Sequence, residues 1–177
     1  MALVRLPADS NDRKASMFRE MRRSSQLLSK EKVVGVLTGA RRGVLSVLGD
    51  DDYPYGVPVN FVYDPTQGEL GAIYFHTALS GHKLDAMLAH DKVSFTTMDE
   101  GYRNEGEWWY YVNSVICFCR ASLIKDPQRK HDALVALAKK YFPPSVDIEA
   151  DIAKNGDRIH MVELTIEHMT GKIVQEK

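Results

Sequence analysis

The chain has 177 residues, 44% of them hydrophobic, and its 23 lysine and arginine residues almost balance 24 acidic residues, giving a formal net charge of -1. This length supports one domain with a full core, and the near-zero charge excludes a global field that would draw the chain to nucleic acid or anionic lipid. With no secretory signal and no apolar run long enough to span a membrane, we expect a cytoplasmic protein that recognises a small molecule, without nucleic-acid or membrane partners.

The start of the chain differs in character from the rest. Residues 1–23 mix charged side chains with few apolar positions, which predicts a loosely attached N-terminal arm ahead of a single domain at 24–177. Ser29 is a favourable helix N-cap, and apolar residues recur after it at helical spacing as far as Gly39. The pattern therefore predicts a short amphipathic helix near the start of the domain.

Three strand-like segments follow, at 43–48, 55–63 and 70–77. Turn residues at 49–52 and 64–68 separate them, and such short connections predict an antiparallel meander. Residues 80–90 have a helical pattern, and 92–98 predict a further strand.

The second half of the chain begins with a polar, glycine-containing segment at 99–107, which predicts a loop. The run at 108–124 is rich in aromatic and β-branched residues and predicts a long strand. Asp126 and Pro127 are typical of an N-cap and first helical position, and the helix is expected to run to about Tyr141. The last predicted elements are a short helix, a strand and a short terminal segment, at 145–154, 158–166 and 170–172.

Together these elements predict a mainly antiparallel β fold of the α+β class, a small barrel of at least six strands with peripheral helices. Regular helices do not separate the strands, and neither common glycine-rich nucleotide loop occurs, so a doubly wound parallel sheet is disfavoured. Cys117 and Cys119 lie two residues apart in a predicted strand, so they share a face and cannot easily bridge. We interpret them as buried, reduced thiols, and we predict no metal site.

One predicted junction between a strand and a helix has the chemistry of an anion site. Ser80 and Gly81 lie where the helix begins, and the first amides of a helix have no internal partners. Lys83 adds a positive charge in the first turn, while His76 and His82 add donors whose protonation can follow the ligand. Several converging donors suit phosphate better than carboxylate. Taken alone, the same pattern also fits a capped helix with a solvated lysine, so both interpretations remain open at this point.

Five stretches taken together resemble a known family. In chain order they are YGVPVNFVYD (55–64), IYFHTALSGHKLDAM (73–87), KVSFTTM (92–98), NSVICFCRASLI (113–124) and EHMTGKI (167–173). They are similar to the pyridoxamine 5'-phosphate oxidase-like, FMN-binding split-barrel superfamily, and more narrowly to its nitroimidazole-resistance (Nim-like) branch. The resemblance extends over 20–173, almost the whole chain.

The resemblance implies a homodimer of six-stranded split barrels, with FMN, or alternatively FAD, in a groove at the dimer interface. Val57, Pro58, Val59 and Asn60 are implied to run along the isoalloxazine ring, and a proline suits an edge strand beside a ligand because it cannot donate to a ladder. The implied contacts around the flavin phosphate, with Lys83 foremost, are Phe75, His76, Thr77, Ser80, His82 and Lys83. The implied contributions of the second subunit come from near Trp108, Trp109, Tyr111, Asn113 and Ser114.

The resemblance further implies an FMN-dependent oxidoreductase that reduces small molecules, such as nitroimidazoles, by hydride transfer through the flavin. Because the flavin carries the chemistry, no catalytic side chain is predicted, and His76 is the candidate nearest the substrate. Two alternatives stay open, a flavin-binding module without turnover and a heme-binding split barrel. The arginine-rich substrate segment of pyridoxamine 5'-phosphate oxidases proper is not found near the C-terminus, which disfavours that activity.

Overall fold

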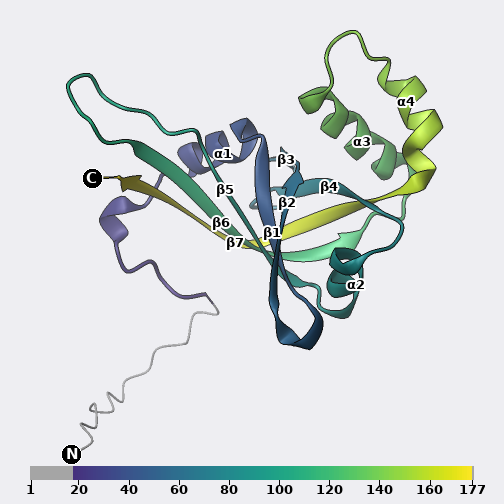
Figure 1. The fold of residues 1–177 in the computed structure, drawn as a ribbon, viewed down its shortest axis with the longest axis horizontal. Helices are drawn as coiled ribbons and strands as arrows, with labels where there is room; N and C mark the ends of the chain where they lie inside the picture. The colour runs from purple at the N-terminus through teal and green to yellow at the C-terminus, as the bar shows by residue number, and fades with distance from the viewer. Residues whose placement is uncertain (1–17, 177) are drawn as a thin grey trace, which may run out of the picture.

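The computed structural model describes residues 18–176 (Figure 1). Most of the predicted arm at 1–23 therefore lies outside the described residues. The helices are α1 (Lys30–Gly39), α2 (His82–Ala89), α3 (Pro127–Tyr141) and α4 (Ile148–Asn155). The strands are β1 (Arg42–Leu48), β2 (Pro54–Asn60), β3 (Val62–Asp64), β4 (Ala72–Ala78), β5 (Lys92–Met98), β6 (Tyr111–Leu123) and β7 (Ile159–Gln175).

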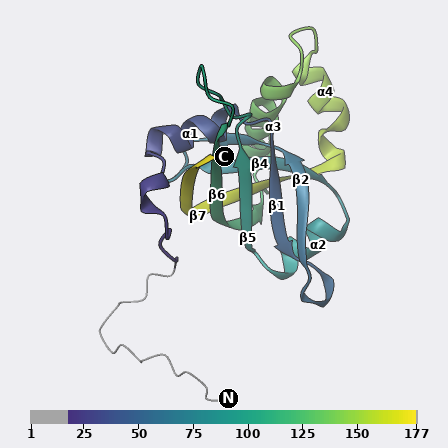
Figure 2. The same ribbon diagram turned by 60° about the vertical axis from the view of Figure 1, so that its left-hand side comes forward.

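These strands form one antiparallel sheet in the order β2-β1-β5-β6-β7-β4-β3. The two edge strands, β2 and β3, follow each other in the chain with Phe61 alone between them. The sheet must therefore curl until its two edges meet, and the curl is visible in both views (Figures 1 and 2). The predicted mainly antiparallel, split-barrel architecture is confirmed.

The strand count is one higher than the predicted six, because the segment expected as a single strand at 55–63 is divided at Phe61. The Phe61 backbone N–H donates to the Tyr141 hydroxyl at 2.9 Å, and that hydroxyl lies 2.9 Å from the Phe61 carbonyl oxygen. Since Tyr141 satisfies both backbone groups of Phe61, the chain can leave the β1 ladder and begin pairing with β4.

The core lies inside the curl and is built from the residues that alternate inward along strands such as β1 and β5. Leu45, Phe61 and Phe95 are fully buried there, and the rings of Phe61 and Phe95 meet edge to face at 4.7 Å. Cys117 and Cys119 share this inner face as free thiols, as predicted, and burial raises the pKa of Cys117 to about 12. The inner face is thus apolar and close-packed.

Helix α1 packs against β3, β5, β6 and β7 at one end of the curl (Figure 2). Its predicted N-cap is confirmed, since the Ser29 side chain accepts the Lys32 N–H. Val33 and Leu37 on its inner side are buried in the same core. The helix therefore covers one end of the barrel core, which the sheet alone would leave open.

A second, smaller core joins β4 and β7 to α3 and α4, with Tyr74, Leu134 and Met161 at its centre. Asp126 caps α3 by accepting the Arg129 N–H, and Pro127 occupies the first turn, as predicted. Among the described residues no helix is both long and apolar enough to cross a membrane.

Three element boundaries differ by three residues or more from the sequence-based expectation. Strand β6 begins at Tyr111 instead of 108, because the preceding residues form a projecting loop. Helix α4 begins at Ile148 instead of 145, after its Asp147 cap. The two last predicted segments are one continuous strand, β7, which pairs with β6 along almost its whole length.

Candidate functional site

Strand β2 offers one free edge for a ligand, because β1 is its only ladder partner among the described residues. Val59 is buried and Val57 half-buried against the core, and the backbone groups of both face Gly43 and Leu45 of β1, so the free edge is formed by the backbone of Gly56, Pro58 and Asn60. Pro58 and Asn60 alternate with them and are exposed on the other face. The position of Pro58 in an edge strand agrees with its missing N–H donor.

Strand β4 runs into the second part of the candidate site. Phe75 and Thr77 point into the barrel core and are 0% and 2% exposed, and the ladder pairs them with Val162 and His160 of β7, so their side chains cannot reach a surface ligand. His76 lies on the opposite, outward face. Burial, and then the nearby Lys83 ammonium, lower the pKa of His76, which favours a neutral imidazole at neutral pH.

The junction after β4 has the geometry expected of an anion site. Gly81 has φ 132°, a conformation that residues with a Cβ rarely adopt, and it turns the chain into α2. Leu84 and Asp85 donate their N–H groups to the Gly81 carbonyl, whereas helix geometry supplies no acceptor for the N–H groups of His82 and Lys83. The exposed Ser80 hydroxyl precedes them.

The two basic side chains of this junction differ in their surroundings. Lys83 is half-buried, and its ammonium has no salt-bridge partner among residues 18–176. The His82 ring instead stacks on Tyr55 at 4.3 Å, and its Nε2 accepts the Asp50 N–H at 3.4 Å and lies 3.7 Å from the Asp50 carboxylate. Lys83 is therefore available to an anion, while His82 is already held by the β1–β2 turn.

The residues predicted to act from a second subunit lie elsewhere in the chain. Trp108 and Trp109 stand on the loop between β5 and β6, edge to face at 5.8 Å, and this loop projects well away from α2 in both views (Figures 1 and 2). Tyr111 begins β6 and stacks on Tyr102 at 5.1 Å. Within one chain, the structure does not bring these aromatic residues to the β2–β4–α2 site.

Asn113 has a partner inside its own β5–β6 hairpin, and Ser114 has one on the neighbouring strand β7. Asn113 donates its side-chain amide to Asp99 at 2.7 Å, while its Oδ1 is buried without a hydrogen-bond partner among the described residues. The Ser114 hydroxyl is 3.5 Å from the Lys172 carbonyl oxygen, a weak contact that leaves it able to bind elsewhere. Asn113 thus retains one unused acceptor at the start of β6.

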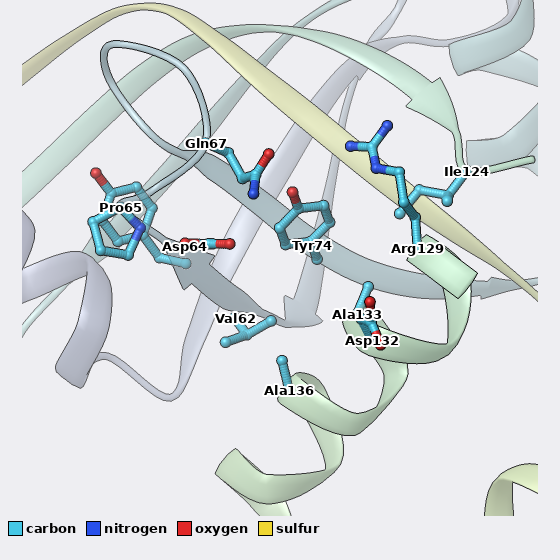
Figure 3. A pocket seen from close by; sticks show the side chains of 11 residues that line it. Val62, Asp64, Pro65, Gln67, Tyr74, Ile124, Arg129, Asp132, Ala133 and Ala136 are labelled. Carbon is cyan, nitrogen blue, oxygen red and sulfur yellow. The ribbon is translucent and has the colours of Figure 1, made fainter. Parts of the chain in front are cut away.

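Two cavities flank α3, and no sequence pattern predicted either of them. One, of about 270 Å³, lies between α3 and the β3–β4 hairpin, where Tyr74 stands near Arg129 (Figure 3). There the Arg129 guanidinium is already paired with Glu163 at 2.6 Å. The other, of about 280 Å³, lies between α3 and α4 and contains Asn60 and His76 of the predicted site. Neither α3 nor α4 carries a sequence motif that would have predicted these cavities.

No group of three or more His, Cys, Asp or Glu side chains within 18–176 is arranged to hold a metal ion. The site is instead defined by a free strand edge, an outward imidazole and a helix start whose lysine has no ionic partner in the described part of the chain. A helix start with unpaired amides beside a lysine favours the binding of an anion.

Comparisons with known proteins identify the family of this chain. Residues 29–173 match the family model described as pyridoxamine 5'-phosphate oxidase. The chain belongs to this family, so the resemblance found in the sequence is confirmed. No curated protein sequence matches the chain.

Solved structures share the fold at low sequence identity. A proposed 5-nitroimidazole antibiotic resistance protein from Bacteroides thetaiotaomicron is 19% identical with a TM-score of 0.68, over 84% of this chain and 87% of that one. A conserved protein from Mycobacterium tuberculosis is 17% identical with a TM-score of 0.69, over 86% and 90%. An FAD-binding protein from Mesorhizobium loti is 22% identical with a TM-score of 0.59, over 84% and 97%. At these identities the likenesses show the split-barrel fold alone.

Proposed function

We propose that this protein binds FMN and works as an oxidoreductase on small molecules, of which nitroimidazoles are one candidate class. The observation that carries the proposal is the start of α2, where Lys83, the backbone N–H groups of His82 and Lys83, which have no acceptor within the helix, and the exposed Ser80 follow directly after β4. The similar protein from Mesorhizobium loti binds FAD, and FAD remains the alternative cofactor.

The donor set fits a phosphate group. Free N–H groups at a helix start and the helix dipole favour an anion there, and a lysine ammonium supplies a full charge. Lys83 has no competing carboxylate partner among the described side chains, so binding an anion would not first require breaking an ion pair. His82 contributes through its backbone N–H, because its ring is engaged with Tyr55 and Asp50.

The free edge of β2 suits the polar edge of a flavin ring. Val57 and Val59 hold the strand in place through the core and the β1 ladder, which leaves the outward backbone groups of Gly56 and Asn60 and the Pro58 carbonyl at fixed positions. Flavin bound there would supply two-electron transfer, and the chain would orient it and exclude water. The neutral imidazole of His76 lies on the same outward face and can both donate and accept a proton at its two ring nitrogens.

Replacing Lys83 with alanine tests the phosphate site. We expect FMN affinity to fall roughly tenfold to a hundredfold, because a hydrogen bond to a charged group contributes about 1.5–3 kcal/mol. Riboflavin lacks the phosphate, so its affinity should stay unchanged in the same variant. Titration of both flavins by fluorescence quenching measures the difference.

Lys32, an exposed lysine on α1, provides the matched control, since Lys32→Ala should leave both affinities as they are. Equal loss of FMN and riboflavin affinity in Lys83→Ala would indicate a general structural defect. Unchanged FMN affinity would remove Lys83 from the site. Reduction of the bound flavin by NADH or NADPH, followed by its reoxidation with a nitroaromatic acceptor, then separates an oxidoreductase from a binding module without turnover.

A homodimer is the second part of the proposal, and the outer face of the sheet supports it. Two aligned rows cross β1, β5, β6 and β7 on this face. Their members are Val44, Thr96, Ile116 and Thr170 in one row, and Ser46, Ser94, Phe118 and His168 in the other. His168 is the one ionisable residue in these two rows. The apolar side chains of Ile116 and Phe118 are nevertheless 42% and 41% exposed. Such a face suits a second copy of this chain.

Replacing Ile116 with aspartate should shift the protein from dimer to monomer, because it places an unpaired charge in the centre of this face. Light scattering across a concentration series measures the change. Leu88→Asp is the control: this exposed leucine lies on α2, away from the sheet face, and its replacement should leave the dimer intact. A wild-type chain that stays monomeric with flavin bound would contradict the proposed dimer.

A further inference from the structure

The cavity between α3 and α4 adjoins the proposed flavin site but extends well beyond it. Strand residues Asn60, His76 and Ile159 form one side of this cavity, and residues of the two helices form the other. Its volume of about 280 Å³ lies close to the lower end of the range of pockets that hold small organic ligands. Because His76 and Asn60 also belong to the proposed flavin strands, a molecule in this cavity would lie beside the flavin.

The lining is apolar over most of its area. Its helix residues include Leu134 and Leu137 of α3, Ile152 of α4, and the rings of Tyr141 and Phe142. A ligand with a flat hydrocarbon or aromatic body would remove this surface from water, which favours binding by about 25 cal/mol per Å² of apolar area buried. The body of the ligand is therefore expected to be apolar.

The polar groups of the lining carry negative or no charge. Asp151 is the one carboxylate among the described lining residues, and neither lysine nor arginine is among them. Its Oδ1 accepts the Asn155 side-chain amide at 2.8 Å, while no salt bridge to Asp151 occurs among the described residues. The carboxylate thus retains acceptor capacity for a ligand.

Three cations on neighbouring elements are directed elsewhere. The Arg41 guanidinium lies over the Tyr141 ring at 5.4 Å, and the Lys140 ammonium lies over the Phe61 ring at 4.2 Å. Lys83 is close enough to influence His76 but is assigned to the flavin phosphate in the proposed function. None of the three lines the cavity.

We propose that the cavity between α3 and α4 binds the small-molecule substrate. This substrate is a flat apolar compound whose polar end is an amine or another hydrogen-bond donor. Asp151 determines this specificity. The inference rests on the proposed flavin site for its role in turnover. Anionic substrates, phosphate esters included, are excluded, since their charge would be desolvated next to the Asp151 carboxylate with no cation among the described lining residues.

Three ring compounds of matched size test the inference on the FMN-loaded protein. They are 4-nitrobenzylamine (cationic), 4-nitrobenzyl alcohol (neutral) and 4-nitrobenzoate (anionic), with dissociation constants measured by isothermal titration calorimetry. In the wild-type chain we expect the amine to bind at least tenfold more tightly than the benzoate, with the alcohol between them. Equal or tighter binding of the benzoate would overturn the inference.

Variants of Asp151 test whether this residue causes the preference for the amine. Asp151→Asn should abolish the advantage of the amine over the alcohol, and Asp151→Lys should reverse the order of amine and benzoate. Asp132→Asn is the control, because Asp132 is a carboxylate of α3 that lines the other cavity. An amine preference that persists in Asp151→Asn, or that disappears in Asp132→Asn, would overturn the assignment to Asp151.

FMN affinity measured in each variant separates this inference from the proposed function. Normal FMN binding with no discrimination among the three rings would contradict the substrate cavity and leave the flavin site standing. If the wild-type chain binds no flavin, the flavin site is wrong, and the same three titrations on the flavin-free chain still decide whether the cavity selects amines. Retained FMN binding together with lost amine preference in Asp151→Asn would support both.

Discussion

Replacing Gly43 with alanine is expected to lower the free energy of unfolding by about 3 kcal/mol, near the upper end for overpacking a core. A Cβ at this position would lie 2.6 Å from Phe95 Cε1 and 2.9 Å from Cε2. The Phe95 ring is fully buried and packs edge to face on Phe61, so it has no space into which to move. Strand β1 would have to shift away from the core instead.

Urea denaturation of wild type and Gly43→Ala measures the effect. Gly35→Ala is the control, since a Cβ at that position in α1 meets nothing within 4 Å. It should be neutral or stabilising by up to about 1 kcal/mol, because alanine loses less backbone entropy than glycine in a helix. Equal stability of wild type and Gly43→Ala would show that the core next to β1 is looser than the structure indicates.

Removing the hydroxyl of Tyr141 should produce the second large effect, a loss of about 1–3 kcal/mol in Tyr141→Phe. The hydroxyl accepts the Phe61 N–H and lies within hydrogen-bonding reach of two carbonyl oxygens, those of Phe61 and Arg41. Phenylalanine keeps the ring packing but leaves the Phe61 N–H without its partner at the corner between β2 and β3. Burial raises the pKa of Tyr141, so the hydroxyl remains a donor throughout the neutral range.

Thermal unfolding and amide exchange together check this prediction. The exchange rate of the Phe61 amide should rise in Tyr141→Phe, since its hydrogen bond is the one removed. Tyr53→Phe is the control: Tyr53 is 75% exposed, and its loss of a hydroxyl should change little. An unchanged Phe61 amide exchange rate would mean that the corner is held by the strand ladders alone.

Several features could be predicted from the sequence because short-range chemistry decides them. The caps at Ser29 and Asp126 and the bounds of β5 at 92–98 depend on neighbouring residues or on strict alternation, and all three are confirmed. Gly81 also lies at the predicted start of the helix, where its positive φ turns the chain from β4 into α2.

Other features depend on residues far apart in the chain. The break at Phe61 needs Tyr141, which lies 80 residues later, so alternation alone predicted one strand where the structure has two. The ring of His82 is a candidate phosphate donor in the sequence, yet Tyr55 and Asp50 hold it in the structure. The full length of β7 likewise becomes visible only through its pairing with β6.

By itself, the sequence determined the antiparallel barrel, the family and the strand-to-helix junction at Ser80–Lys83, because alternation, caps and local motifs act over a few residues. Only the tertiary structure decided that Phe75 and Thr77 face the core, that Lys83 lacks an ionic partner among the described residues, and that Asp151 joins His76 in one cavity. The physical reason is that burial and charge pairing are set by the packing of elements that are distant in the chain. A helix that folds over a strand creates a cavity whose lining no local pattern encodes.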